Sequence, residues 1–97
     1  MDIEEIRQCF RERRFSLSRH ADQEAGAAQV ITVEIQQAGS RAELLAEEDW
    51  HSGGVRYLLC GLTDIGRRLH IPIAFDTDGE VIIVSVYERK HKERRRR

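Results

Sequence analysis

The segment around Asp78-Gly79 limits the possible folds of this 97-residue chain more than any other feature. Residues 67–76 and 81–88 are two largely apolar stretches on either side of it, with the composition of β-strands. Asp-Gly favours a tight hairpin because both positions tolerate positive φ. We therefore expect two antiparallel strands joined by a two-residue loop, with Phe75 opposite Ile82.

The same register predicts which polar side chains become neighbours. Counted back from the loop, Pro72 pairs with Ser85 and His70 pairs with Tyr87, all on the face opposite the apolar one. Directly opposed side chains have Cβ atoms about 4.5–5.5 Å apart, so His70 should contact Tyr87. Pro72 lacks an N–H, and in this register the position of the missing N–H points away from the last strand. We therefore expect the ladder on that other side to be interrupted or bulged at Pro72, or the strand to be an edge there.

The rest of the sequence predicts helices before strands. Apolar residues at helical spacing indicate a helix over 2–13, and two further helical stretches are expected, one opening near Asp22 and one over 32–38. Additional strands are expected at 15–18, 42–48 and 55–63. These elements predict an α+β fold, with N-terminal helices packed on a small, mainly antiparallel sheet of four or five strands.

The length corresponds to a single domain, which we place at residues 1–88, followed by a basic C-terminal tail at 89–97. The tail holds seven Lys and Arg residues against one Glu, although the net charge of the chain is −1. Such a tail attracts RNA, and its effect falls as salt rises. The alternative is an unstructured, solubilising tail. The candidates for nucleic-acid contacts are Arg89, Lys90, Lys92, Arg94 and Arg95.

Cysteine usage and hydropathy indicate the compartment. Cys9 and Cys60 are isolated thiols, so a reducing cytosol and a cytoplasmic location are expected. No apolar run approaches the roughly 18 residues of a membrane span, and we expect no membrane contact. No cluster of Cys, His or carboxylate residues has metal-ligand spacing, so we expect neither a metal nor another cofactor.

Three short motifs carry the candidate chemistry: Ser-Arg-His-Ala at 18–21, Gly-Arg-Arg-Leu-His at 66–70, and Ser-Val-Tyr-Glu at 85–88. RNA cleavage by its own 2′-OH needs a base, an acid, and a cation for the charge that develops on phosphorus. These motifs supply proton-handling and cationic groups. The candidate catalytic residues are His20, Arg67, His70, Ser85 and Tyr87.

Each candidate also has a structural interpretation. His20 could hydrogen-bond the sheet edge, and His70 with Tyr87 could be a cross-strand pair that fills the second face. Arg67 and Arg68 are adjacent and point to opposite faces, so only one of them can join a site with His70. A solvated arginine is the ordinary outcome for either.

In their order and spacing, these motifs resemble a small family within the RelE/ParE-like toxin group. The resemblance also includes a helix at 31–35 and covers most of residues 15–88. It implies a helical N-terminal half on a small antiparallel sheet, and a toxin–antitoxin role that often involves RNA cleavage. Carried over by position, the family-like polar residues are His20, Arg67, His70 and Tyr87, with Ser85 where threonine is commoner.

The chain departs from the family pattern at Pro72, in a strand that is usually aliphatic, and at Arg89, where proline often follows. The leading expectation is a metal-independent ribonuclease that acts on RNA and is neutralised by an antitoxin protein. The alternative is a non-catalytic module that keeps the fold and binds a protein or nucleic acid. The acidic residues at 43–49 favour this alternative, because they would repel RNA.

Overall fold

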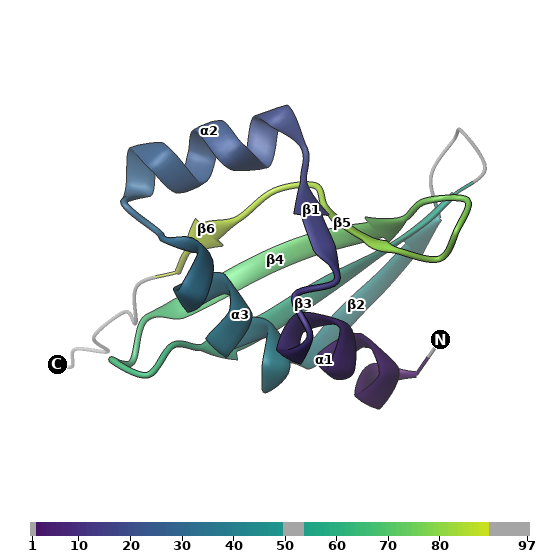
Figure 1. Ribbon diagram of the computed structural model, residues 1–97, viewed down its shortest axis with the longest axis horizontal. Coiled ribbons are helices and arrows are strands. Elements are labelled where there is room, and N and C mark those ends of the chain that lie inside the picture. The colour runs from purple at the N-terminus through teal and green to yellow at the C-terminus, as the bar shows by residue number, and fades with distance from the viewer. Residues whose placement is uncertain (1, 50–53, 90–97) are drawn as a thin grey trace, which may run out of the picture.

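The computed structural model describes residues 2–49 and 54–89. It confirms the predicted α+β fold, in which N-terminal helices pack on a mainly antiparallel sheet (Figure 1). The sheet order is β1-β5-β4-β3-β2, with β6 also paired to β4, and among the described strands only the β1–β5 pairing is parallel. The described elements are α1 (Ile3–Arg11), β1 (Phe15–Leu17), α2 (Arg19–Ala28), α3 (Thr32–Ser40), β2 (Glu43–Asp49), β3 (Val55–Leu62), β4 (Arg68–Phe75), β5 (Val81–Ile83) and β6 (Tyr87–Glu88).

Helices α1 and α3 contact each other and cover one face of the sheet, whereas α2 contacts β1 and β6 (Figure 1). The first helix begins at a capping box in which the side chains of Asp2 and Glu5 accept each other's backbone N–H. Its apolar side buries Ile6 and Phe10 against the sheet. The sheet side of this core consists of Leu59, Leu69, Ile71, Ile73, Val81, Ile83 and Val86.

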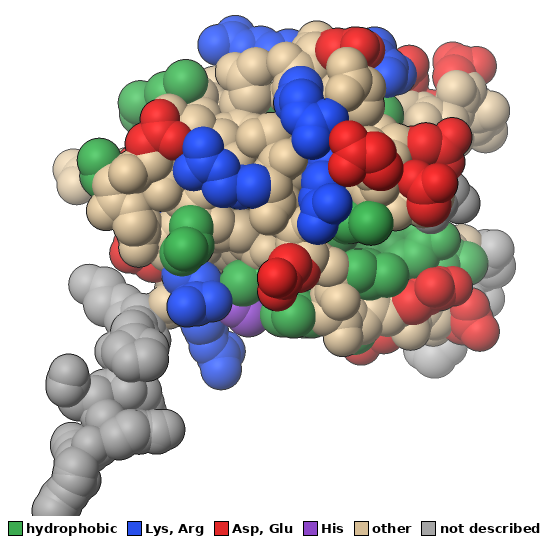
Figure 2. Space-filling view, turned by 90° about the horizontal axis from the view of Figure 1, so that it is seen from below, with side chains coloured by type: hydrophobic (Ala, Val, Ile, Leu, Met, Phe, Trp, Pro, Cys, Tyr) green, Lys and Arg blue, Asp and Glu red, His purple; other side chains and the backbone are tan. Residues whose placement is uncertain are grey.

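Strand β2 forms one edge of the sheet, where β3 is its only neighbour among the described strands. Its acidic side chains are exposed, and so are Leu44 and Leu45. Hydrophobic side chains lie beside acidic ones on the molecular surface seen from below (Figure 2). This edge therefore presents unpaired backbone groups together with acidic and apolar side chains.

The hairpin loop is one residue longer than predicted. Phe75 pairs with Val81, not with Ile82, and the backbone N–H of Asp76 donates to the carbonyl of Glu80 at 3.0 Å. The loop therefore spans the three residues between Asp76 and Glu80. The expected two-residue loop is wrong.

A side chain explains the longer loop. The Asp76 carboxylate accepts hydrogen bonds from the backbone N–H groups of Asp78 and Glu80, at 2.8 and 2.9 Å. Gly79 then adopts φ of 79°, the left-handed conformation that a three-residue hairpin loop needs. The Asp76 side chain thus stabilises the longer loop locally, which alternation of apolar residues cannot reveal.

A β-bulge restores the register at the far end of the hairpin. The N–H of Val84 donates to the carbonyl of Pro72 at 2.8 Å, yet His70 pairs with Tyr87. On β4, only Ile71 lies between Pro72 and His70. On the opposite segment, two residues, Ser85 and Val86, lie between Val84 and Tyr87. The extra residue compensates for the longer loop.

The bulge also changes which side chains enter the core. The predicted register, with Phe75 opposite Ile82, would place Ile82, Val84 and Val86 on the apolar face. The structure instead buries Val81, Ile83 and Val86, while Ile82 and Val84 are half-buried on the opposite face. The one-residue shift at the loop reverses which side chains of residues 81–84 face the core. The bulge at 85–86 then restores the predicted orientation from Val86 onward.

Pro72 interrupts the ladder on the side opposite to our expectation. The β3–β4 ladder continues through the Leu58–Pro72 pair, and the break instead faces the bulge. In a regular ladder the N–H of residue 72 would donate to the carbonyl of Val84. That carbonyl accepts the Ser18 hydroxyl at 3.0 Å, and the same hydroxyl oxygen caps α2 by accepting the N–H of Ala21. Ser18 thus replaces the donor that proline lacks.

Close packing of α3 yields a prediction about two glycines. A Cβ added at Gly39 in α3 would lie 2.1 Å from ring atoms of Phe10, whereas a Cβ at Gly26 in α2 would meet nothing within 4 Å. We expect Gly39→Ala to destabilise the fold by about 1–3 kcal/mol through overpacking. The matched control Gly26→Ala should stabilise it by about 0.5–1 kcal/mol, because alanine favours helix. Urea unfolding followed by circular dichroism measures both, and equal effects of the two substitutions would contradict the packing.

Candidate functional site

The candidate site lies on the sheet face away from α1 and α3, which we term the outer face. Successive residues of β4 alternate between the two faces. Leu69 and Ile71 are fully buried beneath the helices, whereas Arg68, His70 and Pro72 lie on the outer face and are at least partly accessible. The outer face therefore presents a cationic, an imidazole and an apolar side chain in sequence along one strand.

His70 and Tyr87 contact each other on this face, as predicted. They are register partners between β4 and β6, and their ring centroids lie 5.4 Å apart with planes inclined by 28°. This is a stacked arrangement of a histidine on a tyrosine ring. Each ring restricts the movement of the other.

The environment of His70 favours its neutral form. Burial lowers the pKa of the His70 imidazole, and the positive charges of Arg89 and Arg68 lower it further. Arg89 follows β6 directly, and its backbone N–H donates to the carbonyl of Arg68 at 2.9 Å. The lowered pKa favours the neutral imidazole of His70 beside two guanidinium groups, an arrangement suited to a base that works next to an anion.

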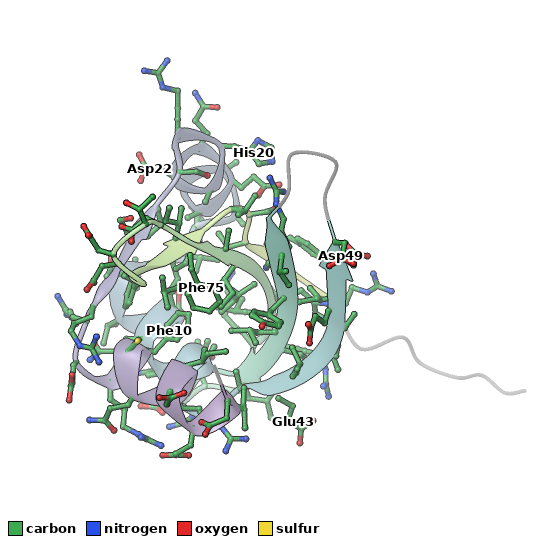
Figure 3. All side chains as sticks on the ribbon, turned by 90° about the vertical axis from the view of Figure 1, so that its right-hand side faces the viewer. Phe10, His20, Asp22, Glu43, Asp49 and Phe75 are labelled. Atoms are coloured by element: carbon green, nitrogen blue, oxygen red, sulfur yellow. The ribbon has the colours of Figure 1, made fainter. Side chains whose placement is uncertain are left out.

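A cleft of about 370 Å³ opens on the outer face next to this pair. His20, Ser85 and Tyr87 line one part of it, so two of the three motifs meet there with the tyrosine that stacks on His70. Figure 3 shows His20 on the α2 side of the molecule, away from the interior position of Phe10. His20 and Tyr87 therefore lie on the same side of the sheet, where both line one cleft.

Glu24 fixes this part of the cleft, and the motif analysis did not single it out. Its Oε1 accepts the Ser85 hydroxyl and the backbone N–H of Val86, the latter at 3.0 Å. Its Oε2 lies 3.3 Å from His20 Nε2. Burial alone would raise the pKa of Glu24, but these hydrogen bonds and the charge of His20 together lower it. The spacing of His20 and Glu24, four residues apart on a helix, is the signal that could have revealed the pair.

The contact with Glu24 defines the position of Ser85. Its hydroxyl donates to a carboxylate whose pKa is lowered, and that carboxylate also binds the bulge backbone. Ser85 therefore helps hold the bulge in place beside the cleft. His20, by contrast, keeps 66% of its side-chain surface exposed while one ring nitrogen faces Glu24.

The structure corrects the placement of Arg67, which does not line the cleft. Each of its N–H groups has a partner, and three of these hydrogen bonds go to Glu34 and Glu88, at 2.9 to 3.2 Å. The other two go to the carbonyls of Ala28 and Gln29 at the end of α2, at 2.9 and 3.0 Å. The hydrogen bond that Arg67 donates to Glu88 raises the pKa of its guanidinium most; burial opposes this effect, and the hydrogen bond to Glu34 adds to the rise. Its donors are committed to the fold, so a phosphate would have to displace them.

Arg68, not Arg67, is the arginine of this motif that is positioned to act together with His70. It shares the outer face with His70, and its Nη1 lies 3.9 Å from the Cys60 sulfur. The signal was present in the sequence, because residues 68 and 70 have the same parity on an alternating strand. Apolar residues at 69, 71 and 73 marked the other face as the buried one.

The candidate nucleic-acid contacts of the tail fall mainly outside the described residues. Lys90, Lys92, Arg94 and Arg95 belong to that group. Arg89 is described and exposed, and it adjoins Arg68 and His70. Of these five tail residues, Arg89 is therefore the one that can be placed beside the site.

The described residues hold neither a metal-ligand cluster nor a membrane-spanning helix. Residues 2–49 and 54–89 contain no group of three or more His, Cys, Asp or Glu side chains arranged to hold a metal ion. Over the same residues, no helix has both the length and the apolar character needed to cross a membrane. Cys9 and Cys60 are buried free thiols.

Comparison with known proteins places the chain in a family. Residues 17–88 match the family described as a domain of unknown function, DUF4258. This match spans the motifs, the cleft and almost the whole sheet, and the chain belongs to that family. No curated protein and no solved structure gives a significant match.

Arg67 and Arg68 provide a matched test of the described contacts. Arg67→Ala leaves Glu34 and Glu88 without their cation and two carbonyls without their donor. We expect a loss of about 2–4 kcal/mol in the free energy of unfolding, below the cost for a fully buried pair because the side chain is 19% exposed. Arg68→Ala should change it by only about 0.5 kcal/mol. Urea unfolding measures both, and a larger effect at Arg68 would contradict these roles.

Proposed function

We propose that this domain is a small, metal-independent ribonuclease of the toxin type, neutralised by an antitoxin protein and active in the cytoplasm. The resemblance to the RelE/ParE-like group supports this proposal, and the two buried free thiols fit a reducing compartment. The observation that carries it is the environment of His70: its pKa is lowered, its ring stacks on Tyr87, and it lies close to Arg68 and Arg89.

The reaction uses groups of the outer face. His70 takes the proton from the ribose 2′-OH, and the 2′-oxygen forms a bond to phosphorus. The bond from phosphorus to the 5′-oxygen breaks, and that oxygen receives a proton from His20, which Glu24 orients. The products are a 2′,3′-cyclic phosphate and a 5′-hydroxyl. Arg68 and Arg89 stabilise the charge that develops on the phosphate oxygens, the role expected earlier for Arg67.

The roles of the two histidines follow from their surroundings. A base must be unprotonated at rest, and burial with two nearby guanidinium groups favours this form of His70. The leaving oxygen needs a proton donor that is held in position, and Glu24 Oε2 lies 3.3 Å from His20 Nε2 and orients that ring. Tyr87 touches both environments, because it stacks on His70 and lines the cleft with His20.

A second candidate is a non-catalytic module that binds a protein partner. The exposed edge of β2 favours it, since this strand offers unpaired backbone groups, exposed leucines and acidic side chains. The same acids would repel RNA near that edge. Under this alternative His70 and Tyr87 are a packing pair, and no RNA is cut.

Cleavage assays separate the two candidates. We expect the purified chain to cut single-stranded RNA in the presence of a chelator, to leave 2′,3′-cyclic phosphate ends, and to spare DNA, which lacks the attacking hydroxyl. His70→Gln and His20→Gln should each slow cleavage by about 10²- to 10⁴-fold. His91→Gln, a change of the same type in the basic tail, serves as the control and should keep full activity.

Three results would contradict the ribonuclease. These are activity that disappears with the chelator, equal cleavage of DNA, and unchanged rates in both His70→Gln and His20→Gln. A chain that cuts no RNA but binds a protein through β2 would establish the second candidate instead. Charge reversal at Glu47 on the exposed edge should then weaken partner binding.

A further inference from the structure

We propose that the far end of the cleft, at Glu48 and Arg56, is a subsite that selects guanine. The inference rests on the proposed function for the identity of the ligand as RNA, and it specifies which nucleotide the site accepts. Its two charged groups, Glu48 and Arg56, lie away from the His70–Tyr87 pair. The proposed chemistry leaves them without a role.

The strand register places a carboxylate beside a guanidinium at this end. Glu48 of β2 and Arg56 of β3 are directly opposed partners, and both line the cleft. Directly opposed residues have Cβ atoms about 4.5–5.5 Å apart. Arg56 lies two residues before Leu58 on β3, so the two share a face, and Leu58 pairs with Pro72 of β4. An acidic and a basic group therefore border the cleft together at its β2 end.

The surroundings suit a flat ring. Leu58, Pro72 and Val84 supply apolar surface to the cleft, and Tyr87 contributes an aromatic ring. A volume of about 370 Å³ falls within the range of small-ligand sites and is enough for one nucleotide. Aromatic and apolar surfaces bind a nucleobase by stacking, whereas polar groups at the rim determine which base is accepted.

Guanine matches this pair of charged groups better than the other bases. Its N1–H and N2–H₂ groups are adjacent donors for a carboxylate, and its O6 and N7 atoms are adjacent acceptors for a guanidinium. The two pairs of atoms lie next to each other around the ring, as Glu48 and Arg56 do across the strands. Adenine would place its N1 acceptor against the carboxylate. Uracil offers a single ring donor, and cytosine only an exocyclic amine.

The subsite connects to the proposed catalytic groups through Tyr87. This residue lines the cleft and stacks on His70, so a base in the cleft has its sugar and 3′-phosphate near that histidine. Arg68 and Arg89 are close enough to influence the charge of His70. The arrangement predicts cleavage on the 3′ side of guanosine.

The direct experiment measures binding of the four 3′-mononucleotides to the full chain by titration calorimetry. We expect 3′-GMP to bind at least tenfold more tightly than 3′-AMP, 3′-CMP or 3′-UMP. Glu48→Gln removes an acceptor needed by N1–H and N2–H₂, so it should weaken 3′-GMP binding to the level of 3′-AMP and leave 3′-UMP unchanged. Glu47→Gln is the matched control, because Glu47 is an adjacent exposed acid opposite Tyr57, on the other face of β2. It should keep the preference for 3′-GMP.

Mapping of cleavage positions on RNA separates this inference from the proposed function. Selective 3′-GMP binding that depends on Glu48, with no RNA cut, supports the subsite and removes the ribonuclease. RNA cleavage without any preference for guanosine supports the ribonuclease and removes the subsite. Equal affinities for the four nucleotides, or equal effects of Glu48→Gln and Glu47→Gln, would overturn the inference, and so would failure of all four to bind.

Discussion

The contact of Glu24 with the bulge at 85–86 is the interaction on which the arrangement of the outer face depends. One carboxylate oxygen accepts the Ser85 hydroxyl and the Val86 N–H, and the other faces His20. The bulge it holds places Tyr87 opposite His70. The same carboxylate thus orders the strand that carries the tyrosine and the helix that carries the first histidine. Loss of this contact would release both sides of the cleft together.

Ser18 and Arg67 complete the attachment of α2. Ser18 caps the helix start and supplies Val84 with the hydrogen bond that Pro72 cannot give. Arg67 binds the carbonyls at the helix end and joins them to Glu34 of α3 and Glu88 of β6. Both ends of α2 are therefore tied to the sheet by polar side chains. Two residues from the candidate motifs, Ser18 and Arg67, serve the fold in this way.

The fold class and the His70–Tyr87 contact could be predicted from the sequence, although the contact was predicted from a register that is wrong near the loop. The Asp76 side chain lengthens the loop by one residue, and the bulge inserts one more, so the two errors cancel at His70. Neither could be foreseen, because each depends on a side chain that binds backbone. The alternation of side chains along a strand could have decided between Arg67 and Arg68, because residues 68 and 70 lie on the same face. Glu24 was missed because its bulge partners are distant in sequence.

The central claim is that His70, Arg68 and Arg89 form a phosphate site with a neutral imidazole at its centre. Nuclear magnetic resonance of the His70 ring during a pH titration tests it most directly. The account predicts a midpoint below the ordinary value of about 6.5, because burial and the two arginines disfavour the charged form. Saturating inorganic phosphate should raise the midpoint by offsetting those charges. A His70 that titrates at or above its ordinary value, with no response to phosphate, would contradict the claim.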